Sequence, residues 1–288
     1  MENRKKSYLF VSIAVLLWAS TAAIAKLLLQ NLSGIQIMFY SFIFAILGLF
    51  SIVIAQGKLK SLKSYTKKDY FHIAYMGTLG CFLYSIFLLG ALKYAPAQEA
   101  FILNYLWPIM VVIFATLILK EKLGVKKILG LIFSFFGIYI VMTKGNLLSL
   151  TFTNIKGDIL AVLGAVAYGL FSVLGKKHKF EISTSTLLYY CFAFILVLIS
   201  ILTFSSIPQV SLLQLAGLAW IGLMTNAVAF IFWFKALEYG ETAQMTNMVF
   251  LTPFISLIYI YFLVGEQILP SSIVGLIFIV LGIVIQTF

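Results

Sequence analysis

The tetrapeptide Gly130-Leu131-Ile132-Phe133 appears twice in this chain, the second time as Gly275-Leu276-Ile277-Phe278. It belongs to a longer repeat, because residues 71–140 match the residues 145 positions later without a gap. The matched pairs are Gly77 and Gly222, Ala91-Leu92 and Ala236-Leu237, Tyr94 and Tyr239, Pro108 and Pro253, Glu121 and Glu266, and Gly137 and Gly282. The sequence therefore predicts two copies of one structural unit, residues 1–150 and residues 151–288.

The composition indicates a protein that is solvated by lipid. Hydrophobic residues make up 62% of the chain and charged residues 10%, whereas soluble domains are roughly 45–50% apolar and about 25% charged. A membrane-spanning helix needs about 20 mostly apolar residues. Ten such stretches are present: Tyr8 to Leu29, Ile35 to Ala55, Phe71 to Leu92, Ala97 to Leu119, Lys127 to Thr143, Gly157 to Gly175, Ser185 to Phe204, Leu212 to Ala236, Ala243 to Val264 and Pro270 to Thr287. We predict an all-α membrane protein with ten transmembrane helices, five in each half, and no soluble domain.

The basic residues, which give the chain a net charge of +11, gather in alternate loops. Clusters precede span one, follow span two, surround the turn after span four and follow span six, whereas the loops Gln30 to Gly34 and Ser205 to Gln214 carry none. The positive-inside rule then places both termini in the cytoplasm. The charge is an orientation signal, so we expect a multi-pass protein of the cytoplasmic (inner) membrane whose partner is the lipid bilayer, with no nucleic acid.

The first 29 residues, with basic residues and the small cluster Ala22-Ala23-Ile24-Ala25, resemble a secretory signal. Two observations favour a retained span. The apolar run is long enough to cross the membrane, and at an offset of 150 it matches span six, with Trp18 on Tyr168 and Lys26 on Lys176. We therefore expect this segment to stay in the fold as span one.

An odd number of spans in each half turns the second copy upside down. Inverted repeats about an axis in the membrane plane give two similar conformers that open to opposite sides, as alternating access requires. A secondary transporter is therefore the leading hypothesis. A membrane enzyme would need clustered catalytic side chains, but His72 and His178 have no acidic or nucleophilic cluster near them in the sequence. A channel would need rings of like charge or carbonyl filter loops, and neither is evident.

The two cysteines, Cys81 and Cys191, lie mid-span among apolar residues, which favours inert buried thiols. The sequence contains no disulfide pattern, zinc motif or phosphate-binding loop. We expect no cofactor and no enzymatic activity. Without an ATP site, transport would be driven by a gradient of substrate, proton or another ion.

The repeated segments resemble the EamA-type repeat of the drug/metabolite transporter superfamily. The resemblance rests on Ala91-Leu92-Lys93-Tyr94 through Pro108 to Lys120-Glu121-Lys122-Leu123, Gly130 and Gly137, on the second copy from Ala236-Leu237-Glu238-Tyr239 through Pro253 to Gly265-Glu266-Gln267-Ile268, Gly275 and Gly282, and on Leu17-Trp18-Ala19-Ser20. One departure is that the family often has an arginine after a Phe-Tyr pair in span two, where Ser41 follows Phe39-Tyr40 here. A role of that arginine cannot be carried over.

This resemblance implies ten helices around a central substrate cavity, with spans five and ten at the periphery, often in a homodimer contact. It also implies a small-molecule substrate. Many members export amino acids and related compounds, and others import. Aromatic and amide side chains with few charges suit a zwitterionic or amphipathic molecule. We expect the cargo to be an amino acid or amino-acid-like metabolite and the direction to be export, as in many members, with import or export of amphipathic cations or other metabolites as the alternative.

Candidate substrate-binding residues are polar or aromatic side chains that lie well inside spans. Trp18 and Tyr168 occupy repeat-related faces near mid-span, and other candidates fall at helical spacing on spans six, eight and nine. Core packing explains such side chains as well as substrate contact does. The full predicted set is Trp18, Tyr40, Tyr84, Glu99, Asn104, Tyr168, Ser172, Asn226, Trp233, Gln244 and Asn247.

Pro108 and Pro253 each lie mid-span, where proline removes one backbone hydrogen bond and pushes away the carbonyl four residues earlier, at Asn104 and Val249. We expect a kink at matched depth in spans four and nine. The kink is either a fixed bend or a hinge that opens alternate sides of the cavity. A freed carbonyl at membrane depth must be buried in protein or line water, which favours a position beside the cavity.

Charged residues inside a span are functional candidates by default. Lys26 lies about one turn from the outer end of span one and can snorkel to the surface. Glu99 lies three residues into span four, where it either caps the helix or binds a cation or proton. Glu121 and Glu266 recur at helix ends, so we expect a structural role in the turn and leave them out of the site.

Overall fold

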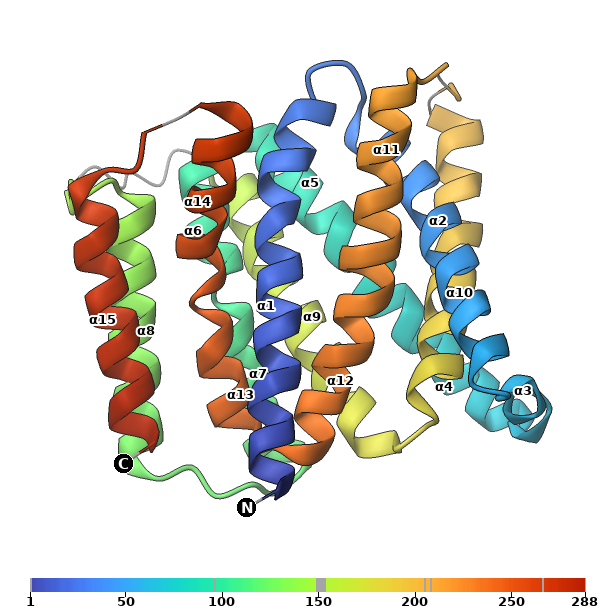
Figure 1. The fold of residues 1–288 in the computed structure, drawn as a ribbon, viewed down its shortest axis with the longest axis horizontal. Helices are drawn as coiled ribbons and strands as arrows, with labels where there is room; N and C mark the ends of the chain where they lie inside the picture. Colours follow the sequence, from blue (N-terminus) through green and yellow to red (C-terminus); the bar gives the residue numbers. More distant parts are fainter. Residues whose placement is uncertain are drawn as a thin grey trace.

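The computed structural model describes residues 2–95, 97–148, 154–204, 206–207, 209–265 and 267–287. All regular secondary structure in these residues is helical, and the helices form one bundle (Figure 1). Nine spans are long and apolar enough to cross a membrane, and a shorter apolar helix, Pro270–Ile285, is the tenth. The all-α membrane fold with ten transmembrane helices is therefore confirmed.

Six spans are single helices, and four are built from consecutive helical segments. The single helices are α1 (Glu2–Leu28), α2 (Gly34–Ala55), α8 (Val125–Met142), α9 (Ile155–His178), α10 (Ile182–Phe204) and α15 (Pro270–Thr287). Span three comprises α4 (Lys67–Gly77), η1 (Thr78–Leu83) and α5 (Tyr84–Tyr94), and span eight comprises α11 (Leu212–Trp220), η2 (Ile221–Val228) and α12 (Ala229–Tyr239). Span four comprises α6 (Ala97–Asn104) and α7 (Trp107–Ile118), and span nine comprises α13 (Thr242–Val249) and α14 (Thr252–Val264). A short helix in the loop after α2, α3 (Leu59–Ser64), was not expected.

Spans three and eight each contain a π-helical segment, η1 and η2, at positions related by the 145-residue repeat. A glycine beside each segment allows close contact with another span. A Cβ on Gly77 would lie within 3.0 Å of the Tyr189 backbone in α10, and one on Gly222 within 3.0 Å of the Ser41 backbone in α2. Each repeat thus packs its π-helical span against the other repeat. Such wide turns often occur at functional sites.

Spans four and nine are interrupted at the two prolines, and here the structure corrects the expected kink. Each span is two separate helices, with a turn at Tyr105-Leu106 before Pro108 and another at Phe250-Leu251 before Pro253. The backbone is wound more tightly at the first turn, because the N–H of Leu106 donates to the carbonyl of Leu103, three residues earlier, at 3.1 Å. Each proline then lies in the first turn of a new helix, where its missing N–H is not needed.

Spans five and ten, α8 and α15, lie side by side at one edge of the bundle (Figure 1). Glycines bring their backbones together: a Cβ on Gly282 would meet the Gly130 carbonyl, and one on Gly137 would meet the Gly275 carbonyl. This order of contacts requires the two helices to run antiparallel. The peripheral position expected for these spans is therefore observed, with the two helices packed on each other.

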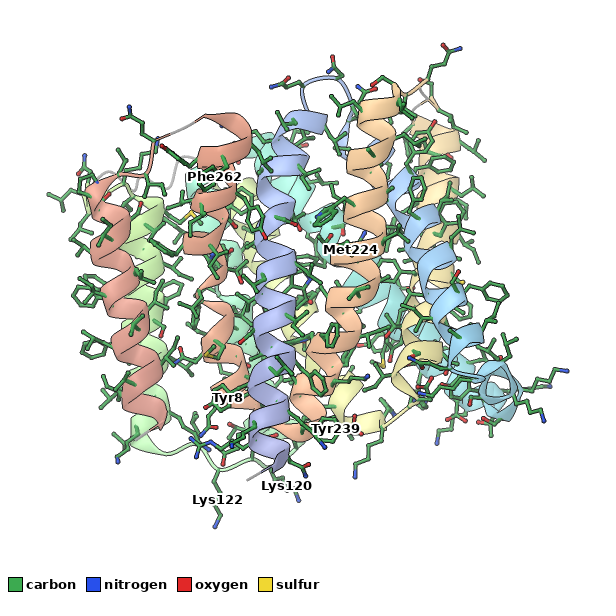
Figure 2. All side chains as sticks on the ribbon, viewed as in Figure 1. Tyr8, Lys120, Lys122, Met224, Tyr239 and Phe262 are labelled. Carbon is green, nitrogen blue, oxygen red and sulfur yellow. The ribbon has the colours of Figure 1, made fainter. Side chains whose placement is uncertain are left out.

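The main apolar core lies among the other eight spans and includes the buried rings of Phe171, Tyr189, Tyr190 and Trp233. The two ends of the bundle differ in charge. Figure 2 shows Lys120 and Lys122 at the end that also holds Tyr8, close to both termini in Figure 1. Phe262, which is 77% exposed, lies toward the other end. One of the basic loops on which the predicted orientation depends, the loop with Lys120 and Lys122, therefore lies at the same end of the bundle as the termini.

Candidate binding site at the centre of the bundle

Five aromatic rings from spans one, four, six and eight meet within the main core. Trp18 lies 5.8 Å from Phe230 and 5.7 Å from Trp233, measured between ring centroids. Tyr168 lies 4.7 Å from Trp107, which in turn lies 5.7 Å from Trp233. We call these five residues the aromatic cluster. Most pairs meet edge to face, the arrangement that aromatic quadrupoles favour, and four different spans are thereby held around one point.

Two indole N–H groups of the aromatic cluster, those of Trp18 and Trp233, are satisfied by partners from other spans. Trp18 donates to the backbone carbonyl of Thr225 at 3.2 Å, and Thr225 lies within η2. Trp233 donates to the hydroxyl of Ser172 on α9 at 3.2 Å. Buried indoles at membrane depth need such acceptors. The bonds therefore fix the ring positions, and η2 supplies one of the acceptors.

Beside the aromatic cluster, spans three and four contribute a polar pair. The Tyr84 hydroxyl donates to Asn104 Oδ1 at 3.3 Å, and the Tyr84 ring lies 4.8 Å from the ring of Tyr168. The amide nitrogen of Asn104 is buried and has no hydrogen-bond partner in the described structure. Gly164 of α9 lies opposite this nitrogen, where a Cβ would approach it to 3.3 Å. A buried hydrogen-bond donor without an acceptor thus lies against α9, next to Tyr84.

Two further polar side chains near the helix breaks are also buried without partners. Both amide atoms of Asn247 on α13 lack a hydrogen bond in the described structure, as does the hydroxyl of Thr252 at the start of α14. Asn104 and Thr252 border the turns at 105–106 and 250–251, and Asn247 lies three residues before the second turn. Buried polar groups without a partner are uncommon and require an explanation, such as a ligand or water. Here they mark the two broken spans.

Six of the predicted site residues are brought together by the fold. They belong to the aromatic cluster, touch it directly or, for Asn104, touch it through Tyr84: Trp18, Tyr84, Asn104, Tyr168, Ser172 and Trp233. Sequence reasoning missed Trp107, although its position directly before Pro108 was a usable signal. It also missed Phe230 as a cluster member, although this residue lies at helical spacing from Trp233 on span eight. Thr252, the repeat counterpart of Trp107, was missed as well.

The remaining predicted residues lie elsewhere or outside the described part. Tyr40 contacts the ring of Phe39 at 5.2 Å and packs at the border between the main core and a smaller apolar cluster that includes Leu28 and Ile37. Asn226 is half-buried on η2, next to Thr225. The side chain of Glu99 lies outside the described residues.

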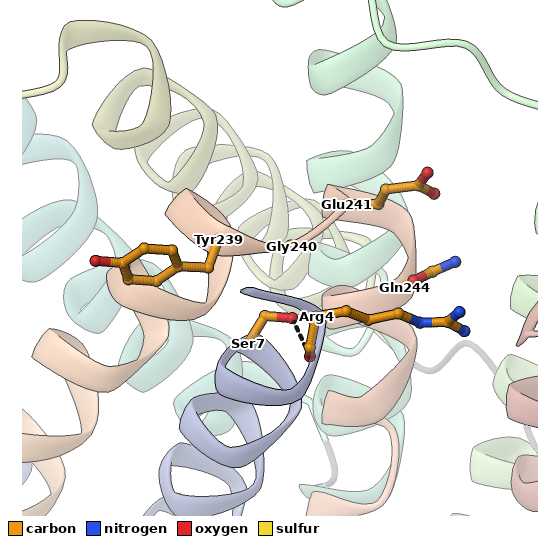
Figure 3. A pocket seen from close by; sticks show the side chains of 6 residues that line it. All are labelled: Arg4, Ser7, Tyr239, Gly240, Glu241 and Gln244. Atoms are coloured by element: carbon orange, nitrogen blue, oxygen red, sulfur yellow. Dashed lines mark hydrogen bonds between the residues drawn. The ribbon is translucent and has the colours of Figure 1, made fainter. Parts of the chain in front are cut away.

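Gln244 lines a small pocket at the end of the bundle that holds the N-terminus (Figure 3). The pocket has a volume of about 200 Å³ and lies between the starts of α1 and α13 and the end of α12, lined by Arg4, Ser7, Tyr239, Gly240, Glu241 and Gln244. The Tyr8 hydroxyl donates to Gln244 Oε1 at 3.3 Å. Figure 3 shows the Arg4 side chain extending beside Gln244. We call this pocket the polar mouth, and it is separate from the aromatic cluster.

The two histidines, separate in the sequence, are in contact in the fold. The rings of His72 at the base of α4 and His178 at the end of α9 lie 4.6 Å apart. Within the described residues, no group of three or more His, Cys, Asp or Glu side chains could hold a metal ion.

Comparison with known proteins adds a family to this geometry. The model of the EamA-like transporter family matches residues 5–143 and, a second time, residues 155–288. An uncharacterized transporter of Archaeoglobus fulgidus is 23% identical over 98% of this chain and 97% of its own length. The transporter YyaM of Bacillus subtilis is 27% identical over 77% of this chain and 74% of its own length.

Two further comparisons concern location and fold. The inner membrane transporter YhbE of Escherichia coli K12 is 24% identical over 84% of this chain and 76% of its own length. One solved crystal structure superposes with a TM-score of 0.88, covering 98% of this chain and 96% of that chain at 19% sequence identity. At this identity the structural match supports the fold.

Proposed function

Because the chain belongs to the EamA-like transporter family, and is thus a multi-pass membrane transporter, we propose that it exports an amino acid or amino-acid-like metabolite by alternating access. In this proposal both termini are cytoplasmic, the membrane is the cytoplasmic (inner) one, and the aromatic cluster forms one wall of the substrate site. The observation that carries the choice of cargo is the unpartnered amide nitrogen of Asn104 beside Tyr84 and Tyr168.

An inverted arrangement of the two repeats is supported by the contact between α8 and α15. The paired glycines exchange places under the 145-residue offset, because Gly130 matches Gly275 and Gly137 matches Gly282. Midway between them, the Ser134 hydroxyl donates to the carbonyl of its own repeat counterpart, Ile279, at 3.3 Å. An antiparallel pair with this pattern has a local two-fold axis perpendicular to the helices. Such an axis in the membrane plane is what inverted repeats require.

The chemistry of the centre supports an amphipathic or zwitterionic cargo. The Asn104 amide offers a hydrogen bond to a carboxylate or carbonyl, and a buried donor gains most from an acceptor that arrives with the substrate. The surrounding rings offer apolar faces to a side chain. The aromatic cluster also supports the second candidate, an amphipathic cation, since indole and phenol faces attract cations.

The broken spans provide the proposed moving parts. In spans four and nine, the turns before Pro108 and Pro253 divide each span into halves that no longer share a continuous hydrogen-bond ladder. Broken helices at the substrate site are a recurring feature of transporters built from inverted repeats. We propose that the two turns act as hinges between conformers that open to opposite sides.

The test is metabolite profiling of expressing cells and their medium, followed by transport of the changed compounds in liposomes that contain the purified protein. We expect ATP-independent movement of an amino-acid-like compound. Trp18→Ala and Tyr168→Ala should reduce transport more than they reduce the folded yield. The matched control is Trp220→Ala, because Trp220 is the one tryptophan outside the aromatic cluster, is 41% exposed and bonds to Ser20. Equal loss of transport and folded yield would assign Trp18 and Tyr168 to packing.

Coupling to protons is a separate part of the proposal and depends on Glu99, an acid inside span four. Glu99→Gln keeps the shape and hydrogen-bonding capacity of the side chain but cannot titrate. Its repeat counterpart is already Gln244. We expect the variant to lose the response of transport to an imposed pH gradient while exchange at equal pH continues. An unchanged response would leave Glu99 as a helix cap.

A further inference from the structure

A charged cluster ties the two repeats together at the end of the bundle that carries the N-terminus. The ammonium of Lys176 on α9 lies 2.8 Å from Glu121 Oε1 in the loop after α7. It also donates to the Thr242 hydroxyl at 2.9 Å and to the carbonyl of Gly240 at 3.0 Å. We call Glu121, Lys176, Gly240 and Thr242 the latch. Three donor protons of one ammonium thus meet three acceptors.

The carboxylate of Glu121 is held as fully as the ammonium. Its Oε1 accepts from the Thr242 hydroxyl at 2.7 Å, and its Oε2 accepts from the Thr242 backbone N–H at 3.3 Å. Burial acts to raise the pKa of Glu121, but the bonds from Lys176 and Thr242 outweigh it and lower the pKa below its ordinary value. The carboxylate therefore stays ionised at neutral pH, and the ion pair persists.

Glu121 also acts as a helix cap supplied by the other repeat. The residue before α13, Glu241, makes no side-chain cap bond to that helix. The carboxylate of Glu121 instead accepts the N–H of Thr242 in the first turn, where the helix dipole favours negative charge. A single side chain of the first repeat thus holds the end of span six and the start of span nine of the second repeat. Loss of this one carboxylate would release both.

On span six, the latch lies one helical turn from the candidate binding site. Its other side is at Thr242, the first residue of span nine. Lys176 follows Ser172 by four residues on α9, so both side chains share a face of that helix. Gly240, whose carbonyl accepts the bond from Lys176, is also one of the residues that line the pocket in Figure 3. The latch therefore lies between the polar mouth and the Ser172–Trp233 end of the aromatic cluster.

We propose that the latch is the cytoplasmic gate of the transport pathway, and that breaking the Glu121–Lys176 pair lets α13 move away and opens the route from the pocket to Ser172. This inference rests on the alternating access proposed above. The sequence repeats both charges, with Lys26 matching Lys176 and Glu266 matching Glu121. A fixed brace of the cytoplasmic end alone would not need its two charged members repeated in the inverted half.

The test measures access to Thr246, which is fully buried on α13 and donates to the carbonyl of Thr242 at 2.6 Å. Thr246→Cys is introduced with Cys81→Ala and Cys191→Ala, and inverted membrane vesicles are treated with a membrane-impermeant maleimide. We expect Glu121→Gln and Lys176→Met each to speed labelling about tenfold, since a bond to a charged group contributes at least that ratio between conformers. The control Lys58→Gln, which breaks the more exposed Lys58–Glu181 pair, should leave the rate unchanged.

The double variant Glu121→Gln with Lys176→Met guards against misfolding, because it leaves neither charge buried alone. It should label as fast as either single variant. Unchanged labelling in the folded double variant, or equal acceleration by Lys58→Gln, would overturn the gate. Labelling requires no substrate, so the gate can fail while transport by the wild-type protein stands. Conversely, faster labelling of the variants without transport of an amino-acid-like compound would reject only the proposed cargo.

Discussion

The two repeats share their backbone devices but differ in the side chains that these devices present. Both have a π-helical segment with a tightly packed glycine at its start, and both have a broken span with a proline after the turn. At the breaks, however, Trp107 and Asn104 of the first repeat correspond to Thr252 and Val249 of the second. In the proposed mechanism, the repeated residues build the moving scaffold, whereas the residues that are not repeated determine what the centre binds.

The largest expected effect comes from the scaffold and should be equal in the two repeats. Gly77→Val and Gly222→Val would each drive a side chain into backbone of another span, which we expect to cost about 3 kcal/mol or more. Thermal unfolding in detergent should show both losses. Gly124→Ala is the control, because a Cβ there meets nothing within 4 Å and the φ angle of −81° suits alanine. A tolerated Gly77→Val with a damaging Gly222→Val would break the symmetry.

The next effect should differ between the repeats. Asn104→Val gives the first break the residue of the second, and Asn247→Ile gives the second break the residue at the matching place in the first. We expect Asn104→Val to weaken substrate binding about tenfold or more through loss of one hydrogen bond. Its amide nitrogen has no partner, so the cost in stability should be limited to the bond from the Tyr84 hydroxyl, about 1 kcal/mol. Isotope counterflow in liposomes measures both variants. A larger loss with Asn247→Ile would move the binding site to the second repeat.

The smallest effect concerns the two hinges and should again be equal. Pro108→Ala and Pro253→Ala restore the backbone N–H that proline lacks, so the hydrogen-bond ladder can continue through the turn. We expect each variant to be at least as stable as the wild type and to exchange substrate more slowly. The measurement is the exchange rate at saturating substrate. Faster exchange in either variant would show that the break is not a hinge.

The sequence predicted what periodicity and repetition record. Ten apolar stretches gave the spans, and the matched prolines located both breaks, although as kinks. The π-helical segments were missed because the apolar pattern continues unchanged through residues 78–83 and 221–228. Since one span cannot reveal which residues of another it meets, Trp107 and the contact of His72 with His178 were also missed.

Glu121 shows a related limit. Its repetition suggested a role within its own turn, but its partners are 55 and 121 residues away, at Lys176 and Thr242. A helix-end glutamate looks the same in the sequence whether it binds its own turn or another repeat. Conversely, Gln244 and Tyr40 matched the polar or aromatic pattern of site residues and yet lie apart from the aromatic cluster, because residue type does not record depth in the bundle.

The most direct test of alternating access around a shared centre is the accessibility of Ser172, which is fully buried and bonded to Trp233. Ser172→Cys, with Cys81→Ala and Cys191→Ala, is exposed to a membrane-impermeant thiol reagent in right-side-out and in inverted vesicles. We predict labelling from both sides and protection from both sides by the transported metabolite. Labelling from one side only, with or without that metabolite, would contradict a centre that opens alternately to the two sides of the membrane.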